Sequence, residues 1–267
     1  MAEAGRNFPP TFYVRKAMGI RIKPTLVWLR NLALDAYYWP RSRQEFTERL
    51  ARVQTPREAV ALIYAYRGGG FYKWLIPNQD KDEIAALAER THAIAPRVIV
   101  EIGTRDGGTL LTWSQCSDRL ELLVSIDLPG GIHGGGYASQ RAKLYRLFTA
   151  NRPGCRLELI RRDSQVESTR AVLADVLQGR PIDFLFIDGD HRYAGVKKDY
   201  ELYAGLVRPG GLIALHDIRP NAKDETIQVF RLWDEIKANK AYSTEEIVHE
   251  PYRGRFGIGL VTTSSER

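Results

Sequence analysis

Cysteine is scarce in this sequence. Cys116 and Cys155 are the only two among 267 residues, and they do not form a Cys-x-x-Cys pair. Their spacing excludes a disulfide framework and a zinc site built from thiolates. A chain with so few cysteines is expected in a reducing compartment, and we predict a cytoplasmic location.

Long apolar runs are also missing. No stretch of about 18 apolar residues occurs, which excludes a helix that spans a membrane. The N-terminal residues include Arg6, Arg15 and Lys16 but no apolar core followed by small residues, so a signal peptide is not expected.

Charge of one sign does not dominate either. The net charge is +7, from 39 basic and 32 acidic residues. This diffuse excess favours an ordinary basic enzyme surface over a nucleic-acid interface. Hydrophobic residues make up 44% of the chain, which excludes disorder of the whole and suits one α/β domain with an extension.

The N-terminal part is expected to be helical and irregular, interrupted by Pro9, Pro10, Pro24, Pro40 and Pro56. With the glycine run at 68–70 it predicts a helical extension or lid over residues 1–70, followed by a second domain over 71–267. The segment 25–39 is apolar and aromatic. We expect it to cover the core or a homo-oligomer interface. Peripheral membrane contact is the alternative, because basic residues precede the segment.

From residue 80 onward, helical and strand patterns alternate. Helices are expected near 80–95, 106–117, 138–151, 165–178, 192–206 and 230–237. Short apolar runs at 98–102, 120–126, 157–160, 182–187 and 212–215 predict buried strands. This alternation predicts a doubly wound, mostly parallel α/β sheet of the Rossmann-like kind. Strands at 247–250 and 257–261 are expected to close it as an antiparallel hairpin.

Ligands of such sheets bind at the carboxyl ends of the strands. The first strand ends in a loop that contains Glu101, Gly103, Thr104, Gly107 and Thr109, where glycines allow a close backbone approach. The second ends at Asp127, whose carboxylate suits ribose hydroxyls. Asp163, Ser164 and Gln165 follow the third strand and suit an adenine edge. A turn former or a helix cap explains each residue singly, but three successive polar ends favour a nucleoside cofactor.

Acidic residues and histidines follow the next two strands. Asp188 ends the fourth strand, and His216 and Asp217 end the fifth. Two neighbouring carboxylates repel unless a proton or cation neutralises them, so these three residues predict a divalent metal site for Mg²⁺ or Mn²⁺. The alternative is a turn at 188–190 with a hydrogen-bonded histidine. His191 is the candidate general base, or else a residue that caps a helix.

These residues resemble the class I S-adenosylmethionine-dependent methyltransferases. Within that class, residues 96–218 and the hairpin near 256–259 look most like the metal-dependent small-molecule O-methyltransferases, which include catechol, macrocin and rhamnosyl O-methyltransferases and the cephalosporin hydroxylase-like group. The family's Glu-x-Gly-x-x-x-Gly motif falls on Glu101, Gly103 and Gly107.

The resemblance implies a role for further residues. Thr109 would bind the cofactor carboxylate and Asp127 the ribose, with Ser164 and Gln165 on the adenine side. Asp188 matches the family's metal-binding aspartate. His191 replaces a catalytic lysine of the catechol enzyme, and His216-Asp217 replaces an acidic or Asp-Asn pair. This last departure removes one oxygen ligand from the predicted metal site.

The resulting hypothesis is a methyltransferase (EC 2.1.1.-) that uses S-adenosyl-L-methionine and a divalent metal to methylate a hydroxyl of a small molecule or glycan. Alternatives are an RNA ribose methyltransferase and a non-catalytic cofactor-binding or membrane-associated scaffold. Methylation of nucleic-acid bases is disfavoured, because the fourth strand lacks an Asn/Asp-Pro-Pro-aromatic sequence. A nicotinamide dehydrogenase is disfavoured because the first loop lacks the dinucleotide fingerprint.

Overall fold

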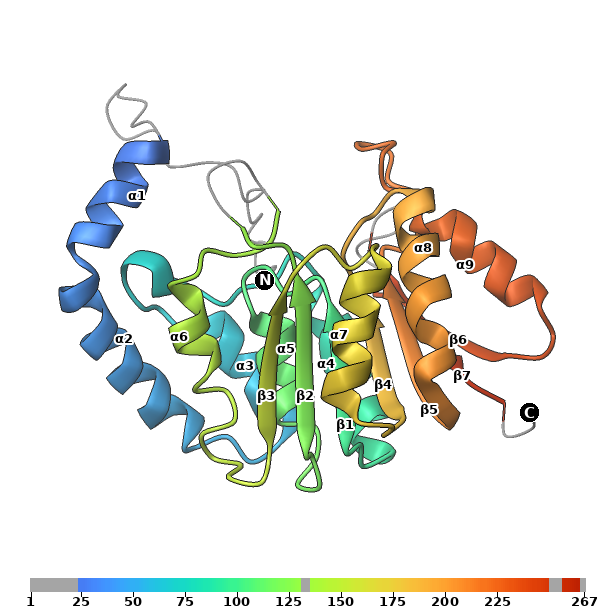
Figure 1. Cartoon of the computed structure of the whole chain (residues 1–267), viewed down its shortest axis with the longest axis horizontal. Coiled ribbons are helices and arrows are strands. Elements are labelled where there is room, and N and C mark those ends of the chain that lie inside the picture. The colour runs from blue at the N-terminus through green and yellow to red at the C-terminus, as the bar shows by residue number, and fades with distance from the viewer. Residues whose placement is uncertain (1–23, 131–134, 250–255, 265–267) are drawn as a thin grey trace, which may run out of the picture.

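The computed structural model describes residues 24–130, 135–249 and 256–264 (Figure 1). At its centre lies a seven-stranded sheet with the order β3-β2-β1-β4-β5-β7-β6. Five of its strands pair in parallel, namely β1 (Val98–Ile102), β2 (Leu122–Asp127), β3 (Arg156–Arg161), β4 (Ile182–Ile187) and β5 (Val207–His216). The predicted doubly wound sheet is confirmed, with the change of direction between β1 and β4.

The last two strands run antiparallel to their neighbours. β7 (Ile258–Thr262) pairs with β5 on one side and with β6 (Ser243–Ile247) on the other. The antiparallel edge was predicted, but the strand placed at 247–250 was wrong because β6 ends at Ile247. β6 is mostly exposed and polar, so it lacks the apolar run by which the other strands were found.

Helices cover both faces of the sheet. The crossover and C-terminal helices are α5 (Gly108–Ser114), α6 (Arg141–Tyr145), α7 (Glu167–Leu177), α8 (Tyr193–Tyr203) with the turn η2 (Ala204–Leu206), and α9 (Val229–Ala238). Side chains alternate along β1, so Val98 and Val100 pack against α7 to α9 while Ile99 faces the opposite side. Figure 1 shows α7 and α8 in front of the sheet.

The N-terminal helices pack on the face of the sheet toward which Ile99 points, opposite α7, α8 and α9. They are α1 (Pro24–Ala33), α2 (Asp35–Leu50), α3 (Pro56–Ala65), the turn η1 (Gly70–Tyr72) and α4 (Lys81–Ala93). α3 begins with a capping box, in which the Thr55 hydroxyl accepts from the Glu58 N–H and the Glu58 carboxylate accepts from the Thr55 N–H. Pro40 lies inside α2, so the expected interruption there is wrong. The buried Phe46 and Leu50 hold α2 against the domain and offset the hydrogen bond that Pro40 cannot make.

Residues 24–70 share one core with the sheet. Phe46 and Ile63 belong to the same buried cluster as Ile99 and Leu123. The glycine run is packed tightly, since a Cβ on Gly69 would lie 2.3 Å from the ring of Tyr38. Of the aromatic residues that follow, Tyr72 is fully buried in the core. This segment therefore stabilises the domain.

Candidate functional site

A cavity of about 650 Å³ lies at the carboxyl ends of the parallel strands, where the sequence predicted a site. It is lined by the residues that follow β1 to β5 and by Pro77, Asn78 and Gln79, which come from the segment before α4. The described residues around it include Thr104, Thr109, Asp127, Asp163, Ser164 and Gln165 and the polar residues after β4 and β5. The structure thus brings both predicted halves of the site to one cavity.

The loop after β1 is held close to β4. Gly103 has φ +89°, and a Cβ there would lie 2.1 Å from the carbonyl oxygen of Asp188. Only glycine fits this left-handed, crowded position. Gly107, with φ +79°, similarly approaches the ring of Tyr145, and it does not line the cavity.

Glu101 lies beneath this loop and does not line the cavity. It is fully buried and accepts hydrogen bonds from Trp113 Nε1 at 2.9 Å and from the Thr104 hydroxyl at 2.7 Å. Burial raises the pKa of Glu101 to about 8, despite these donors. The predicted cofactor residue is thus placed to support the loop from below.

Asp127 is bound by three backbone N–H groups. Its Oδ2 accepts from Thr104 at 3.0 Å and Arg105 at 2.7 Å, and its Oδ1 accepts from Leu128 at 2.7 Å. Burial raises the pKa of Asp127, whereas these donors act to lower it. A carboxylate has about four acceptor positions, so one remains for a ribose hydroxyl.

The residues after β3 form a turn on the cavity wall. The Asp163 carboxylate accepts from the backbone N–H of Gln165 at 2.9 Å, and the Gln165 side chain donates to Asp190 at 3.2 Å. The backbone carbonyl of Ser164 accepts from the Tyr203 hydroxyl at 2.6 Å. These bonds fix the turn in the place predicted for an adenine edge.

Asp188, His216 and Asp217 form a compact buried cluster. One ligand atom from each lies within 4.8 Å of the others. His216 Nδ1 is 3.0 Å from Asp188 Oδ1, an ion contact without hydrogen-bond geometry, and the buried His216 Nε2 has no hydrogen-bond partner among the described residues. Orphaned polar atoms of this kind are costly unless an ion or water satisfies them. Two carboxylates and one imidazole fit a Mg²⁺ or Mn²⁺ ion.

Charge within this cluster is strongly coupled. Burial acts to lower the pKa of His216, but the carboxylates of Asp217 and Asp188 outweigh burial and hold that pKa well above its ordinary value. Burial acts to raise the pKa of Asp217, but His216 and His191 outweigh it and lower that pKa. Asp217 also has φ +62°, which is uncommon for aspartate.

His191 borders the cluster and the cavity. Its Nδ1 lies 2.8 Å from Asp217 Oδ2, and its side chain is 39% exposed. Burial acts to lower the pKa of His191, but the hydrogen bond to Asp217 and the charge of Asp188 outweigh it and raise that pKa. With Nδ1 engaged by Asp217, Nε2 is the nitrogen left for a proton from a ligand.

Gln79 was missed in the sequence. It lines the cavity, and its Nε2 donates a hydrogen bond to Asp188 Oδ2, while its buried Oε1 has no hydrogen-bond partner among the described residues. Gln79 lies 109 positions before Asp188 and belongs to no motif. Only the fold brings the two together.

The neighbours of Gln79 tie it to the far end of the chain. Asp80 caps α4, accepting at Oδ1 from the N–H groups of Asp82 at 2.9 Å and Glu83 at 3.1 Å. The buried Glu83 carboxylate accepts from the backbone N–H groups of His249 and Gly257, both at 3.0 Å. These bonds hold the 79–83 segment and the residues on either side of the β6–β7 connection together beside the site.

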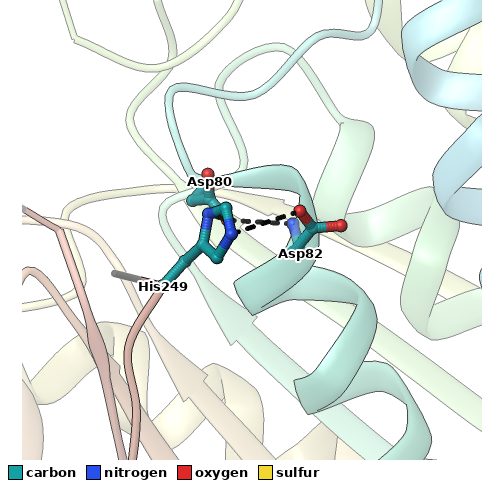
Figure 2. A group of neighbouring side chains, drawn as sticks. All are labelled: Asp80, Asp82 and His249. Atoms are coloured by element: carbon teal, nitrogen blue, oxygen red, sulfur yellow. Dashed lines mark hydrogen bonds and ion pairs between the residues drawn. The ribbon is translucent and has the colours of Figure 1, made fainter. Parts of the chain in front are cut away.

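A second cluster, made of Asp80, Asp82 and His249, lies at the start of α4 (Figure 2). His249 Nδ1 is 3.5 Å from Asp80 Oδ1, and Nε2 is 3.8 Å from Asp82 Oδ2. Because Asp80 already caps the helix, capping and a pair of weak ion contacts account for this arrangement.

Comparison with known proteins gives concordant results. Residues 100–218 match the family model described as a methyltransferase domain. An uncharacterised protein of Acanthamoeba polyphaga mimivirus is 37% identical over 119 residues, which are 44% of this chain and 50% of that protein. An uncharacterised protein of Sinorhizobium fredii is 26% identical over 176 residues, which are 64% of this chain and 17% of that protein. The chain thus spans half or less of these curated relatives.

Two solved structures share the fold. The O-methyltransferase from Bacillus cereus in complex with SAH has a TM-score of 0.53 at 18% identity, covering 79% of this chain and 92% of the other. The O-methyltransferase TomG from Streptomyces achromogenes, in complex with SAM, has a TM-score of 0.53 at 16% identity, covering 80% and 91%.

Residues 100–218 are therefore similar to a methyltransferase domain. The chain has the Rossmann-like α/β fold of these two O-methyltransferase structures, which confirms the fold that the sequence predicted.

Proposed function

We propose that this protein is a metal-assisted, S-adenosylmethionine-dependent O-methyltransferase that acts on a hydroxyl of a small molecule or glycan. The observation that carries the proposal is the cluster of Asp188, His216 and Asp217, with its orphaned buried atoms, at the wall of a cavity that Asp127 also lines. The names of the two solved structures, both O-methyltransferases crystallised with SAM or SAH, support the same chemistry.

The two halves of the cavity suit two ligands. S-adenosylmethionine, when bound, supplies an activated methyl group. Asp127 would hold its ribose, Asp163 to Gln165 its adenine edge, and Thr104 and Thr109 the part nearest β1. Gly103 gives the cofactor loop its close contact with the end of β4. The cofactor and the acceptor would therefore meet between β1 and β4.

The acidic half suits a cation and an acceptor. A divalent metal, when bound, would hold and acidify an acceptor hydroxyl. Asp188 and Asp217 would supply oxygen ligands, and His216 would either ligate or orient them. Gln79 positions Asp188 through its bond to Oδ2, which leaves Oδ1 for the cluster. A vicinal diol, as in a catechol or a sugar, offers the two oxygens that such a site binds best.

His191 is placed to accept the acceptor's proton. Asp217 holds Nδ1, so the proton would pass from the hydroxyl to Nε2 as the oxygen attacks the methyl carbon and the carbon–sulfur bond breaks. The charge of Asp217 stabilises the imidazolium that results. Positioning of the two substrates accounts for most of the remaining rate gain.

Calorimetric titration with S-adenosylmethionine, with and without Mn²⁺, tests the proposal, followed by methylation of catechol as a probe diol. We expect cofactor binding in both conditions and methylation that stops when a chelator is added. Absence of cofactor binding in both conditions would disprove the function. Undiminished methylation of catechol with the chelator present would disprove the metal's part in it.

A further inference from the structure

The outward face of α1 and the start of α2 is apolar, and the described residues leave it exposed. Leu26, Leu29 and Leu32 are 56%, 49% and 44% exposed, and Tyr37 is 54% exposed. We call this the α1 face. The inward side packs on the domain, where Trp28 meets the ring of Phe71. The sequence favoured a segment that covers the core or a homo-oligomer interface, and one side of these helices packs on the core.

Such a face is unusual on a protein surface. A helix that is apolar all round is normally buried, because each half-exposed leucine leaves apolar area in water. In Figure 1, α1 stands at the edge of the molecule that lies farthest from β6. Among the described residues, no helix is both long enough and apolar enough to cross a bilayer.

The charge beside the α1 face has one sign. Between residues 24 and 41 the only acidic residue is Asp35, which points inward to the Tyr72 hydroxyl at 2.8 Å and to Lys143 Nζ at 2.7 Å. Arg30 and Arg41 flank the exposed leucines and Tyr37, and the Arg41 guanidinium lies 3.9 Å from the Tyr37 ring centroid. Within residues 24–41, the one carboxylate is therefore paired on the inward side, and the charges beside the α1 face favour an anionic partner.

The sequence before α1 adds to this charge. Residues 1–23 contain five basic side chains and one acidic, Glu3, for a net charge of +4. An apolar helical face joined to a cluster of lysines and arginines is what binds anionic bilayers, since each basic residue near the surface contributes about 1 kcal/mol. A second copy of the chain would place the same positive charges against each other. A stable dimer also uses about 20 residues a side, more than the α1 face offers.

We propose that the α1 face docks on an anionic lipid surface, with the leucines in the interface and Arg30 and Arg41 against the headgroups. Docking would bring the protein to a membrane through the α1 face, and it is independent of the methyl-transfer chemistry. Tyr37 suits the same boundary because its ring is apolar and its hydroxyl polar.

Co-sedimentation of the full chain with vesicles tests this. We expect binding to vesicles that contain phosphatidylglycerol, little binding to phosphatidylcholine alone, and weaker binding at about 0.5 M salt than at about 0.1 M. The double variant Leu26→Gln/Leu29→Gln should partition about tenfold more weakly, because two half-exposed leucines no longer enter the interface. Val166→Gln, at the residue just before α7, is the control, since Val166 is apolar, 41% exposed and outside the α1 face.

Three results would overturn the proposal: no binding to anionic vesicles at low salt, equal binding of the double variant and the original chain, or equal binding to neutral vesicles. A dimer in light scattering that the double variant dissociates, without vesicle binding, would instead assign the face to a second copy. Circular dichroism of each variant shows that the fold is intact, which exposed positions should preserve.

Discussion

The two halves of the cavity hold their carboxylates in different ways. Asp127, on the cofactor side, is satisfied by three backbone N–H groups that the fold itself supplies. Asp188 and Asp217, on the acidic side, depend on the side chains of His191, His216 and Gln79 and retain orphaned buried atoms. On the cofactor side, the backbone therefore supplies the donors that stabilise the carboxylate. On the acidic side, the two carboxylates need a positive charge between them.

Replacing Asp188 should give the largest difference between metal binding and cofactor binding. We expect Asp188→Asn to lower kcat/KM for catechol by about a thousandfold, because the site loses a charged oxygen ligand. Mn²⁺ binding, measured by calorimetry, should become undetectable, while S-adenosylmethionine binding changes little. Unaltered Mn²⁺ affinity in this variant would show that the acidic half is not the metal site.

Glu101 gives the cofactor half a pH-dependent stability. Its pKa is raised to about 8, above the ordinary 4.5, so the folded protein retains a proton that the unfolded chain has lost. Between those two pH values the Glu101 contribution to the free energy of unfolding falls as pH rises, by about 1.4 kcal/mol per unit. We expect Glu101→Gln to flatten this slope in urea unfolding at pH 5 to 8. A parallel slope in both proteins would contradict the assignment.

His191 is the proposed base between the halves. Substitution His191→Gln preserves polarity but cannot accept a proton, so kcat should fall about a hundredfold. Binding of S-adenosylmethionine should stay within a few-fold, whereas Mn²⁺ affinity should fall only about tenfold, because His191 contacts Asp217 and supports that ligand. Stopped single-turnover assays separate the chemical step from product release. A loss of cofactor affinity equal to the loss of kcat would point to a structural role.

Asp127 provides the counterpart of the Asp188 experiment. Asp127→Asn removes the charge and one acceptor oxygen, so S-adenosylmethionine affinity should fall about thirtyfold, as charge-assisted hydrogen bonds contribute roughly 1.5–3 kcal/mol. Mn²⁺ affinity should be unchanged. If the affinities for S-adenosylmethionine and Mn²⁺ fall together, the two halves of the cavity do not bind their ligands independently.

Gln79 should give the smallest effect. Gln79→Ala removes the donor that orients Asp188, and loss of such a supporting bond weakens metal binding about tenfold. The neighbouring Asn78→Ala, also at the cavity wall, serves as the matched control. Equal Mn²⁺ affinity for Gln79→Ala and the original chain would leave Asp188 positioned by the strand end alone.

Much of this site could be predicted from the sequence. Apolar runs predicted the five parallel strands. Because parallel strands bring their carboxyl ends to one edge of a sheet, Asp127, Asp188 and Asp217 were expected near one another, and all three line the cavity. The closeness of Asp188 and Asp217 follows from the pairing of β4 with β5. These features arise from local pattern and regular geometry.

Other features arise only from tertiary packing. Gln79 reaches Asp188, and Glu83 reaches His249, across 109 and 166 positions without a motif. The strand β6 was misplaced because its sequence is polar. Glu101 was expected to touch the cofactor, but its partners Trp113 and Thr104 lie around it in the interior. Side chains that support other side chains are hard to identify from a single sequence, because their partners are brought close only by the fold.

The shared core of α2, α3 and the sheet bears on how the chain folds. Because Phe46 and Ile63 pack in the same cluster as Ile99 and Leu123, residues 100–218 do not make up a complete folding unit by themselves. Cut out at those limits, the domain would lose the part of this core that α2, α3 and α4 supply. The described helices and strands should instead unfold together, in a single cooperative calorimetric transition. The N-terminal helices are thus as much a part of this domain's stability as the strands that carry its site.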